Sequence, residues 1–378
     1  MFKDKKVLIV QRVITSYRLE LLKELASHFK EVGIITSKGE SKGTLKKAKH
    51  SAIELDNVKV IELKSLKFGY SGDSRSTSLF LYPSVVKHIN KYDYLILEGT
   101  TNILNNSYII PLARLFKKQI VWWDSGYSLN IRTTKRKVID AAVRPLIKMT
   151  HKQMAYSSKG GAYIKAYMGG KHAFTNLNTI NTTYFESIRN EVKDSIESYK
   201  LNTKHIKLLY VGVIEERKKI EELIQVVIKL NKTNNKEKTY SINIIGGGNQ
   251  LDYLQSNYEE ESIRFHGPIY DKEQLKQFYF KSDLFVLPGD GGLAILQSLL
   301  YGLPVLCLYG ADGTEEDYIK DKSFLLNDFK EIHPFLNSFN SIDRDLYLDY
   351  VDEVSSKYWI QKLLNALKTN TQKSSTSV

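Results

Sequence analysis

Short apolar runs alternate with longer amphipathic segments along most of the chain. The runs are rich in Val, Ile and Leu and do not alternate strictly with polar residues, which is typical of strands buried on both faces of a parallel sheet. Strands that alternate with helices indicate doubly wound α/β domains. The predicted strands are residues 6–10, 32–36, 58–63, 94–98, 120–123 and 153–157, then 207–212, 241–246, 263–267, 283–287, 304–308 and 323–326.

Helices are predicted between these strands from apolar positions spaced three and four residues apart. Residues 17–29 carry Leu19, Leu22 and Ala26 on one side, and residues 218–230 repeat the pattern. Residues 177–204 contain a polar stretch without strand signal and are predicted to be a connection with a short exposed helix. A last helix is predicted at 358–367. The Ser/Thr-rich residues 369–378 are predicted to be disordered.

This order of elements predicts an α/β protein with two Rossmann-like, doubly wound domains that face a cleft. The first would span 1–180, a connection 181–205 and the second 206–355. The closing segment 356–378 would hold a helix and a tail, and the C-terminal helices would cross back to the first domain. Open parallel sheets bind ligands beyond the carboxyl ends of their strands, so the chemistry is expected there.

Two predicted strand ends carry features that suit a phosphate. After the strand at 207–212, Gly212 is followed by a turn with Arg217 and Lys218, and a cation pair near a helix start suits a diphosphate. After the strand at 241–246 come Gly246, Gly247 and Gly248, which let a backbone approach a ligand closely. The alternatives are two solvated cations and a tight turn with no ligand.

The most distinctive motif follows the strand at 283–287. Gly289, Asp290, Gly291 and Gly292 form a glycine-rich loop, and a short helix begins near Leu293. The glycines leave the helix N-terminus open to an anion. Gln297 lies further along this helix, where it could bind hydroxyl groups. The alternative is a loop that serves only the path of the chain.

Composition narrows the class of protein. Residues 1–180 hold 31 Lys and Arg against 13 Asp and Glu, whereas residues 181–378 hold 24 against 29. The basic first half suggests an anionic partner such as a membrane surface, a phosphate-bearing acceptor or nucleic acid. The single cysteine, Cys307, excludes an internal disulfide and a cysteine metal site. The apolar run 7–10 is too short for a signal peptide, so a cytoplasmic location is predicted.

The motifs of the second half, in order, resemble those of family 4 retaining glycosyltransferases of the GT-B fold. The likeness runs from Leu208 to about Leu326 and is most specific over residues 292–305. Residues 265–269 resemble the strand after which the family contacts the nucleotide base, and residues 315–319 resemble a Glu-containing helix. In the first half, residues 17–18, 122–126 and 178–180 are similar to segments of capsule and O-antigen glycosyltransferases.

The chain departs from the family pattern at several positions. The family has two glutamates separated by seven residues, and these positions are Gly289 and Gln297 here. Val213 stands where the family has an arginine, which Arg217 could replace. Ser125 stands where a histidine is common. Asp290, beside Gly289, could supply a carboxylate.

The resemblance implies transfer of a sugar from a nucleoside diphosphate sugar to a glycan or polyprenyl-linked acceptor, in bacterial surface polysaccharide synthesis, with retention. It implies no cofactor, and no metal-ligand spacing is present in the sequence. The implied catalytic residues are Asp124, Ser125 and Asp290, although Asp124 could instead cap a turn. The implied donor site holds Gly212, Arg217, Lys218, Gly246, Gly247, Ile269, Gly291, Gly292, Leu293 and Gln297, and the acceptor site Tyr17 and Arg18.

Three other functions are considered: a sugar-nucleotide epimerase, a non-catalytic glycosyltransferase-like partner and a nucleic-acid-binding protein. An epimerase would be expected to place several histidines in the cleft, and only His266 lies near the glycine-rich motifs. The missing glutamates favour a partner subunit. No RNA-recognition signature is present, so no nucleic-acid partner is predicted.

Basic clusters in the first half predict peripheral association with an anionic membrane. One cluster is Lys42, Lys46, Lys47 and Lys49; another is Arg132, Lys135, Arg136 and Lys137, followed by Arg144 and Lys148. Val138, Ala142, Leu146 and Met149 could form an apolar face between these cations, as in an interfacial helix. The alternative is that this segment packs against its own domain.

Overall fold

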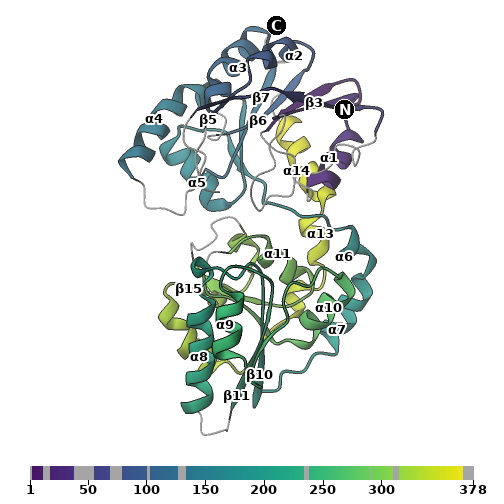
Figure 1. The fold of residues 1–378 in the computed structure, drawn as a ribbon. Coiled ribbons are helices and arrows are strands. Elements are labelled where there is room, and N and C mark those ends of the chain that lie inside the picture. Colours follow the sequence, from purple (N-terminus) through teal and green to yellow (C-terminus); the bar gives the residue numbers. More distant parts are fainter. Residues whose placement is uncertain are drawn as a thin grey trace. The chain divides into compact units, whose positions relative to one another are not determined.

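The structure is a computed structural model, and it divides the chain into two compact units (Figure 1). The first comprises Met1–Asn181 and Val354–Val378, and the second Thr182–Glu353. The residues that the structure describes are 2–11, 18–37, 55–68, 79–99, 103–126, 133–233, 238–289, 291–309 and 315–368. The predicted disorder of 369–378 falls outside these residues.

The first unit is built on a seven-stranded parallel sheet in the order β3-β2-β1-β6-β7-β8-β9. All its predicted strands are present. The short edge strand β9 and a small hairpin, β4 with β5, were not predicted, because three-residue strands leave little pattern. The strands are β1 (Lys6–Val10), β2 (Glu31–Ser37), β3 (Val58–Leu63), β4 (Leu66–Phe68), β5 (Leu79–Leu81), β6 (Tyr94–Glu98), β7 (Gln119–Asp124), β8 (Lys152–Ala155) and β9 (Ala173–Thr175).

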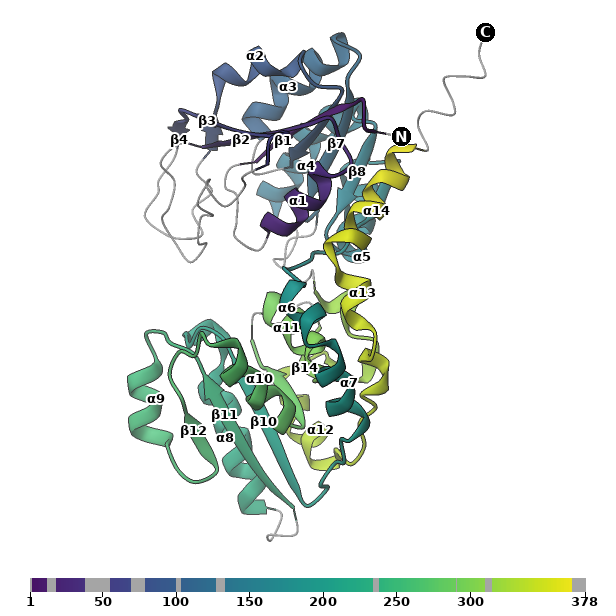
Figure 2. The same cartoon turned by 90° about the vertical axis from the view of Figure 1, so that its right-hand side faces the viewer.

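Both faces of this sheet are buried, because successive side chains of a strand point to opposite sides. Val7 and Trp123 pack on one face with helices α1 (Leu19–Ala26) and α14 (Ser356–Lys368), which lie side by side (Figure 2). Leu8 and Trp122 pack on the other face. That face is covered by α2 (Val86–Ile89), α3 (Ile103–Leu115), α4 (Thr134–Met149) and α5 (Ser158–Tyr167). The C-terminal helix thus belongs to the first unit, as the sequence predicts.

The second unit holds a six-stranded parallel sheet in the order β12-β11-β10-β13-β14-β15. Its strands lie where the pattern predicts them, so two Rossmann-like α/β units are confirmed. They are β10 (His205–Val211), β11 (Thr239–Ile245), β12 (Ile263–Phe265), β13 (Leu284–Leu287), β14 (Val305–Leu308) and β15 (Leu325–Leu326). The helices include α8 (Ile220–Thr233), α9 (Leu251–Tyr258), α10 (Lys272–Lys281), α11 (Leu293–Leu300), α12 (Ile332–Ser338) and α13 (Tyr350–Val354).

Two helix predictions need correction. The helix after β10 begins at Ile220 rather than at residue 218, because a 3-10 turn (Glu216–Lys218) ends in Lys219, which has a positive φ of 54°. The segment predicted as an exposed helix forms α6 (Thr183–Ser187) and α7 (Arg189–Glu197), and α7 buries Val192 and Ile196. Ile196 packs so closely against Gly302 that any side chain at position 302 would collide with it. Helix α7 is therefore part of the second unit's core.

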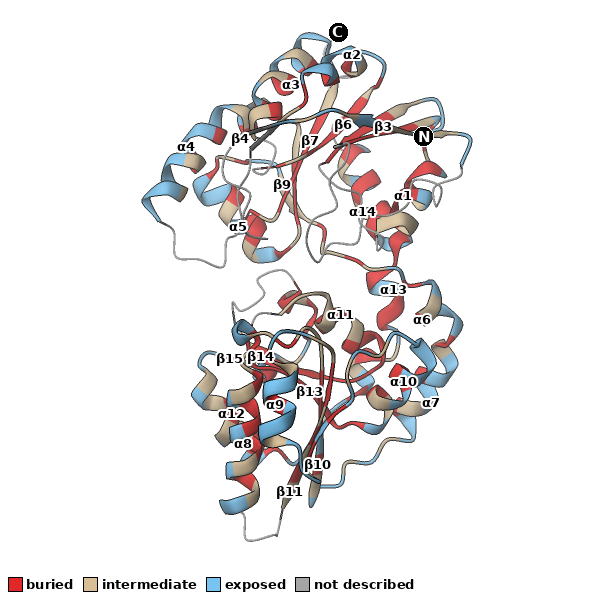
Figure 3. Ribbon diagram, viewed as in Figure 1, coloured by how far each residue is buried: buried red, intermediate tan, exposed pale blue. Residues whose placement is uncertain are grey.

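Burial follows the layers, with the strands buried and the outer faces of the helices exposed (Figure 3). Within the described residues, none of the helices has the length and apolar character needed to cross a bilayer.

Candidate functional site

The predicted donor motifs lie at the topological switch point of the second sheet. The chain runs from β10 to β11 and β12 on one side and then returns to β13 on the other. The loops after β10 and β13 therefore leave the sheet at the carboxyl ends of two neighbouring strands, which is where doubly wound folds bind ligands. The loop after β10 carries Gly212–Lys218, and the loop after β13 carries the glycine-rich motif.

The structure separates the two predicted cations. The Lys218 side chain is buried, and its Nζ donates a hydrogen bond to the carbonyl oxygen of Gly291, 3.1 Å away. The Arg217 side chain is 37% exposed, and its Nε lies 2.7 Å from Glu215 Oε2. Lys218 thus brings a positive charge to the glycine-rich loop, whereas Arg217 is paired at the surface.

The turn that carries these cations is held by Tyr210. Its hydroxyl donates a hydrogen bond to the carbonyl oxygen of Val213 at 2.8 Å. Burial raises the pKa of the Tyr210 phenol above its ordinary value, so the hydroxyl keeps its proton at neutral pH.

Gly289, one of the two positions where the family carries glutamate, packs directly on the turn after β10. A Cβ at this position would stand 2.3 Å from the carbonyl oxygen of Arg217 and 2.8 Å from the Lys218 Cα. A larger residue would therefore displace the backbone that carries Lys218. This contact gives a physical reason for the missing glutamate.

The glycines after β11 have two different roles. A Cβ on Gly246 would stand 1.8 Å from the carbonyl oxygen of Gly212, and φ at Gly246 is 146°. A Cβ on Gly248 would stand 2.1 Å from the carbonyl oxygen of Ile214. These two glycines serve close packing of the loops. Among the described residues, the nearest atom to a Cβ on Gly247 would be Pro268 Cγ at 3.9 Å, so Gly247 is the one of the three with space beside it.

Helix α11 starts at the glycine-rich loop. Gly292 precedes it with a φ of 136°, which favours glycine, and no described side chain caps the helix there. Leu293 and Gln297 lie on the half-buried face of α11, one turn apart. The Leu293 and Gln297 side chains therefore lie on the same face of α11.

The other predicted residues of this unit are placed as follows. Ile269 lies half-buried after β12. Partial burial and the nearby charge of Arg264 lower the pKa of His266, so the His266 ring is neutral at pH 7. Glu315 and Glu316, from the segment similar to the family's Glu-containing helix, are both buried. Asp290 lies outside the described residues.

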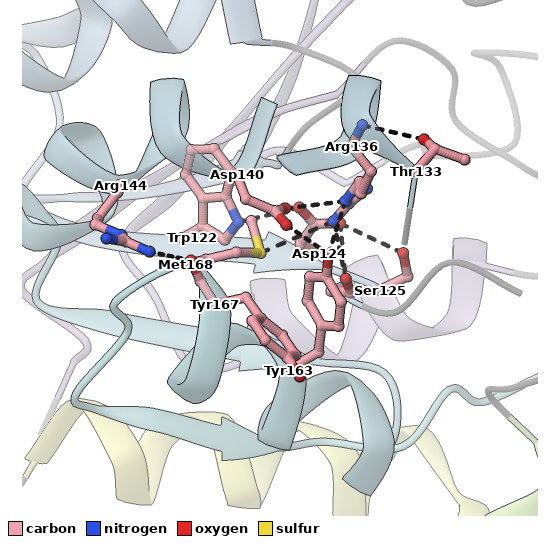
Figure 4. A network of polar contacts seen from close by, with 11 residues as sticks. Trp122, Asp124, Ser125, Thr133, Arg136, Asp140, Arg144, Tyr163, Tyr167 and Met168 are labelled. Carbon is pink, nitrogen blue, oxygen red and sulfur yellow. Dashed lines mark hydrogen bonds and ion pairs between the residues drawn. The ribbon is translucent and has the colours of Figure 1, made fainter. Parts of the chain in front are cut away.

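In the first unit, Asp124 ends β7 and is 6% exposed. Its carboxylate accepts hydrogen bonds from Trp122 Nε1 and the Gly126 amide, both at 3.2 Å, and from Ser125 Oγ at 3.4 Å. Figure 4 shows this group beside Arg136. Asp124 therefore stabilises the turn after β7, which was the alternative to a catalytic role, while Ser125 stays half-buried.

Arg18 bridges the ends of β1 and β8. Its guanidinium donates hydrogen bonds to Gln11 Oε1 at 3.1 Å and to the Tyr156 hydroxyl at 3.0 Å, and lies 4.5 Å from the centre of the Trp123 ring. The structure thus places Arg18 beside β7, from which Asp124 extends. Tyr17 lies outside the described residues.

Helix α4 differs from the predicted interfacial helix. Val138, at 63% exposure, and Ala142 lie at the surface, but Leu146 and Met149 pack against the core. The exposed apolar stripe is instead Val138, Ala141, Ala142 and Pro145, flanked by Lys135, Lys137, Arg144 and Lys148. Arg136 points inward and pairs with the buried Asp140, so it is not a surface cation. Arg132 and the lysines at 42–49 lie outside the described residues.

Comparison with known proteins bears on this geometry. Residues 191–345 match the family described as Glycosyl transferases group 1. This match lies within the second unit, Thr182–Glu353. No curated protein matches the chain by sequence.

Solved structures match the whole chain in fold. HepE of Anabaena, solved in complex with UDP, is 13% identical with a TM-score of 0.64, and the match covers 97% of this chain and 100% of HepE. A UDP-forming α,α-trehalose-phosphate synthase of Burkholderia vietnamiensis is 8% identical with a TM-score of 0.63, covering 97% and 100%. A candidate UDP-N-acetylglucosamine 2-epimerase of Listeria monocytogenes is 12% identical with a TM-score of 0.53, covering 98% and 97%.

At these identities the likeness concerns the fold, which is GT-B, and the group 1 domain together with this fold supports a glycosyltransferase. Sequence reasoning missed the contact of Gly289 with the turn after β10 and the inward direction of Arg136. The spacing of Arg136 and Asp140, four residues apart on one helix, was the available signal for that ion pair.

Proposed function

We propose that this protein is a glycosyltransferase that moves a sugar from a UDP-sugar to a glycan or lipid-linked glycan acceptor. One observation carries the proposal: Lys218 Nζ is held at the Gly291 carbonyl, beside the start of α11 at the switch point of the second sheet. A cation and a helix N-terminus together suit a diphosphate. Support comes from the group 1 domain and from fold neighbours whose crystals hold UDP.

In the proposed reaction, the glycosidic bond to the diphosphate breaks and negative charge develops on the leaving UDP. Lys218 and the amides from Gly291 to Leu293 stabilise that charge, which lowers the barrier without rearrangement of the site. Gly247 and Ile269 lie along the base side of the nucleotide, and Gly212 and Gly246 shape the loops around it. Arg217 can bind the phosphates only if its guanidinium gives up its ion pair with Glu215.

For the first unit and the glycine-rich loop, the proposed roles of the residues are those that the sequence predicts. We propose that Asp124 and Ser125 contact the transferred sugar or the acceptor hydroxyl, with Arg18 and Tyr17 on the acceptor. Asp290 is the proposed carboxylate of the glycine-rich loop. Retention of configuration and independence from metals are also proposed. In the described part of the chain, no group of three or more His, Cys, Asp or Glu side chains could hold a metal ion.

The activity is tested by release of UDP from UDP-sugars in the presence of polyprenyl-linked glycan acceptors. We expect acceptor-dependent release that EDTA leaves unchanged. The appearance of an isomerised UDP-sugar without acceptor would favour the epimerase, a function that shares the fold. Binding of UDP without any turnover would favour a non-catalytic partner.

The ribose contact is tested at Gln297. The variant Gln297→Glu is expected to bind UDP as well as the wild type or more tightly, because a carboxylate accepts stronger hydrogen bonds from the two ribose hydroxyls than an amide does. Calorimetry measures the change. A loss of about tenfold or more, equal to 1.4 kcal/mol, would show that Gln297 does not contact the ribose.

We further propose that the enzyme acts in the cytoplasm on surface polysaccharide and docks to the membrane face that carries the acceptor. The exposed stripe of α4 supports this, because Val138 and Pro145 lie between the exposed Lys135, Lys137 and Lys148. Basic residues beside an apolar stripe suit the interface of an anionic bilayer. Each cation near such a leaflet contributes about 1 kcal/mol.

Docking is tested by co-sedimentation with anionic liposomes. Binding is expected at low salt and is expected to fall at 1 M salt, where the Debye length is about 3 Å. The variant Lys135→Glu/Lys137→Glu/Lys148→Glu should lose most of it, and it spares Arg136, whose loss would disturb the fold. Absence of wild-type binding to anionic liposomes at low salt would contradict the docking proposal.

A further inference from the structure

Arg136 lies at the centre of a polar network that joins α4 to the carboxyl end of β7 (Figure 4). Its Nε is 3.0 Å from Asp140 Oδ1, and its Nη2 donates a hydrogen bond to the carbonyl oxygen of Gly126 at 2.9 Å. The Tyr163 hydroxyl donates to Asp140 Oδ2 at 2.6 Å. The Arg136 guanidinium also lies over the Tyr163 ring, 5.1 Å from its centre. One side chain thus ties α4, α5 and the turn after β7 together.

The burial of this network indicates that its main effect is to fix the positions of its side chains and not to stabilise the folded protein. The Asp140 side chain is 0% exposed and the Arg136 side chain 19%. Removing an ion pair from water costs about as much as the pair regains, so a buried pair is weak evidence for added stability. What the pair does is fix the guanidinium in one orientation, from which it reaches Gly126.

The turn that Arg136 reaches is closely packed and carries the Asp124 carboxylate. A Cβ on Gly99 would stand 2.3 Å from Asp124 Oδ2, and a Cβ on Gly160 would stand 2.0 Å from the Ser125 carbonyl oxygen. Gly126 has a φ of 67° and donates its amide hydrogen to Asp124 Oδ1. A shift of Gly126 therefore moves the amide that donates a hydrogen bond to the Asp124 carboxylate.

We propose that Arg136 is a positioning residue that fixes Asp124 and Ser125 for sugar transfer. It acts through the Gly126 carbonyl and does not itself touch a substrate. The proposal rests on the function proposed above, in which Asp124 and Ser125 contact the sugar or the acceptor hydroxyl. A small displacement of such groups can cost a large factor in rate, up to about a hundredfold.

The test compares two arginines of the same helix. Arg144 Nη2 donates to the carbonyl oxygen of Tyr167 at 2.9 Å, the same distance at which Arg136 reaches Gly126, but this bond joins α4 to α5 and not to the Asp124 turn. The variants are therefore Arg136→Met and Arg144→Met. Because Arg136→Met leaves Asp140 without its cation, the double variant Arg136→Met/Asp140→Asn, which removes both charges, is measured in parallel.

The first readout is a spectroscopic signature of the turn. Trp122 Nε1 donates to Asp124 Oδ2, and the chain has only three tryptophans. Fluorine NMR of protein labelled with 5-fluorotryptophan thus resolves few signals, and Trp122→Phe assigns the one from Trp122. We expect the Trp122 signal to shift or broaden in both Arg136 variants and to stay in place in Arg144→Met.

The second readout is catalytic. UDP-sugar turnover with acceptor is expected to fall about tenfold or more in both Arg136 variants, with UDP affinity unchanged. An unmoved Trp122 signal, a wild-type rate in the double variant, or an equal shift of the Trp122 signal in Arg144→Met would overturn the proposal. If the wild type neither binds UDP nor turns over UDP-sugars, the proposed function fails, and the Trp122 signal still decides whether Arg136 positions Asp124.

Discussion

Replacement of Lys218 by alanine is expected to weaken UDP binding by about 1.5–3 kcal/mol, the range for a hydrogen bond to a charged group. Lys218 is the buried cation at the glycine-rich loop, and its Nζ is already held 3.1 Å from the Gly291 carbonyl. The site is thus arranged before the ligand arrives, and the variant removes this charge. Isothermal titration calorimetry of UDP with wild type and variant measures the change.

Lys218→Met and Arg217→Ala serve as controls. Lys218→Met keeps most of the apolar side chain, so it should lose UDP affinity as Lys218→Ala does while keeping more of the packing. Arg217 is paired with Glu215 and is more exposed, so Arg217→Ala should cost less than Lys218→Ala. Equal losses at the two positions, or none at Lys218, would contradict the assignment of the phosphates to Lys218.

Gly289→Ala is expected to lower the free energy of unfolding by about 1–3 kcal/mol, as overpacking a close contact does. The added Cβ would stand 2.3 Å from the Arg217 carbonyl oxygen, and backbone there must move. Since that backbone carries Lys218, the variant should also bind UDP more weakly. Urea unfolding and calorimetry measure the two effects.

The matched control for this substitution is Gly247→Ala. Among the described residues, its added Cβ would have no neighbour nearer than 3.9 Å, so the stability of the free protein should change by less than about 0.5 kcal/mol. If the two alanine variants were equally stable, the close packing at Gly289 would not explain the glycine at that position.

The architecture could be predicted because doubly wound sheets leave a strong pattern. Central strands such as β1 are short apolar runs, here Val7–Val10, that are buried on both faces, and such runs can be recognised without knowledge of their partner strands. Edge elements such as β9 were missed, since three residues hold too little pattern. The sequence of α7 predicts an exposed helix, because Val192 and Ile196 are its only buried apolar side chains.

The candidate site could be placed from the sequence, but the roles within it could not. Arg217 and Lys218 are adjacent and both basic, and only the fold shows that Lys218 turns toward Gly291. Likewise, the sequence alone shows only that Gly289 replaces a glutamate of the family. The structure adds that Gly289 packs against the turn after β10. The sequence groups Arg136 with its basic neighbours, because a helical sequence shows the spacing of side chains and not the depth at which each of them lies.

The central claim is that the start of α11 and Lys218 hold the diphosphate of a UDP-sugar. It is tested most directly by calorimetry of the wild-type protein with UDP and with UMP, which differ in the second phosphate. We predict that UDP binds about tenfold or more tightly than UMP, a difference of about 1.4 kcal/mol, and that Lys218→Ala removes most of this difference. Equal affinities for UDP and UMP, or no binding of UDP at all, would contradict the account.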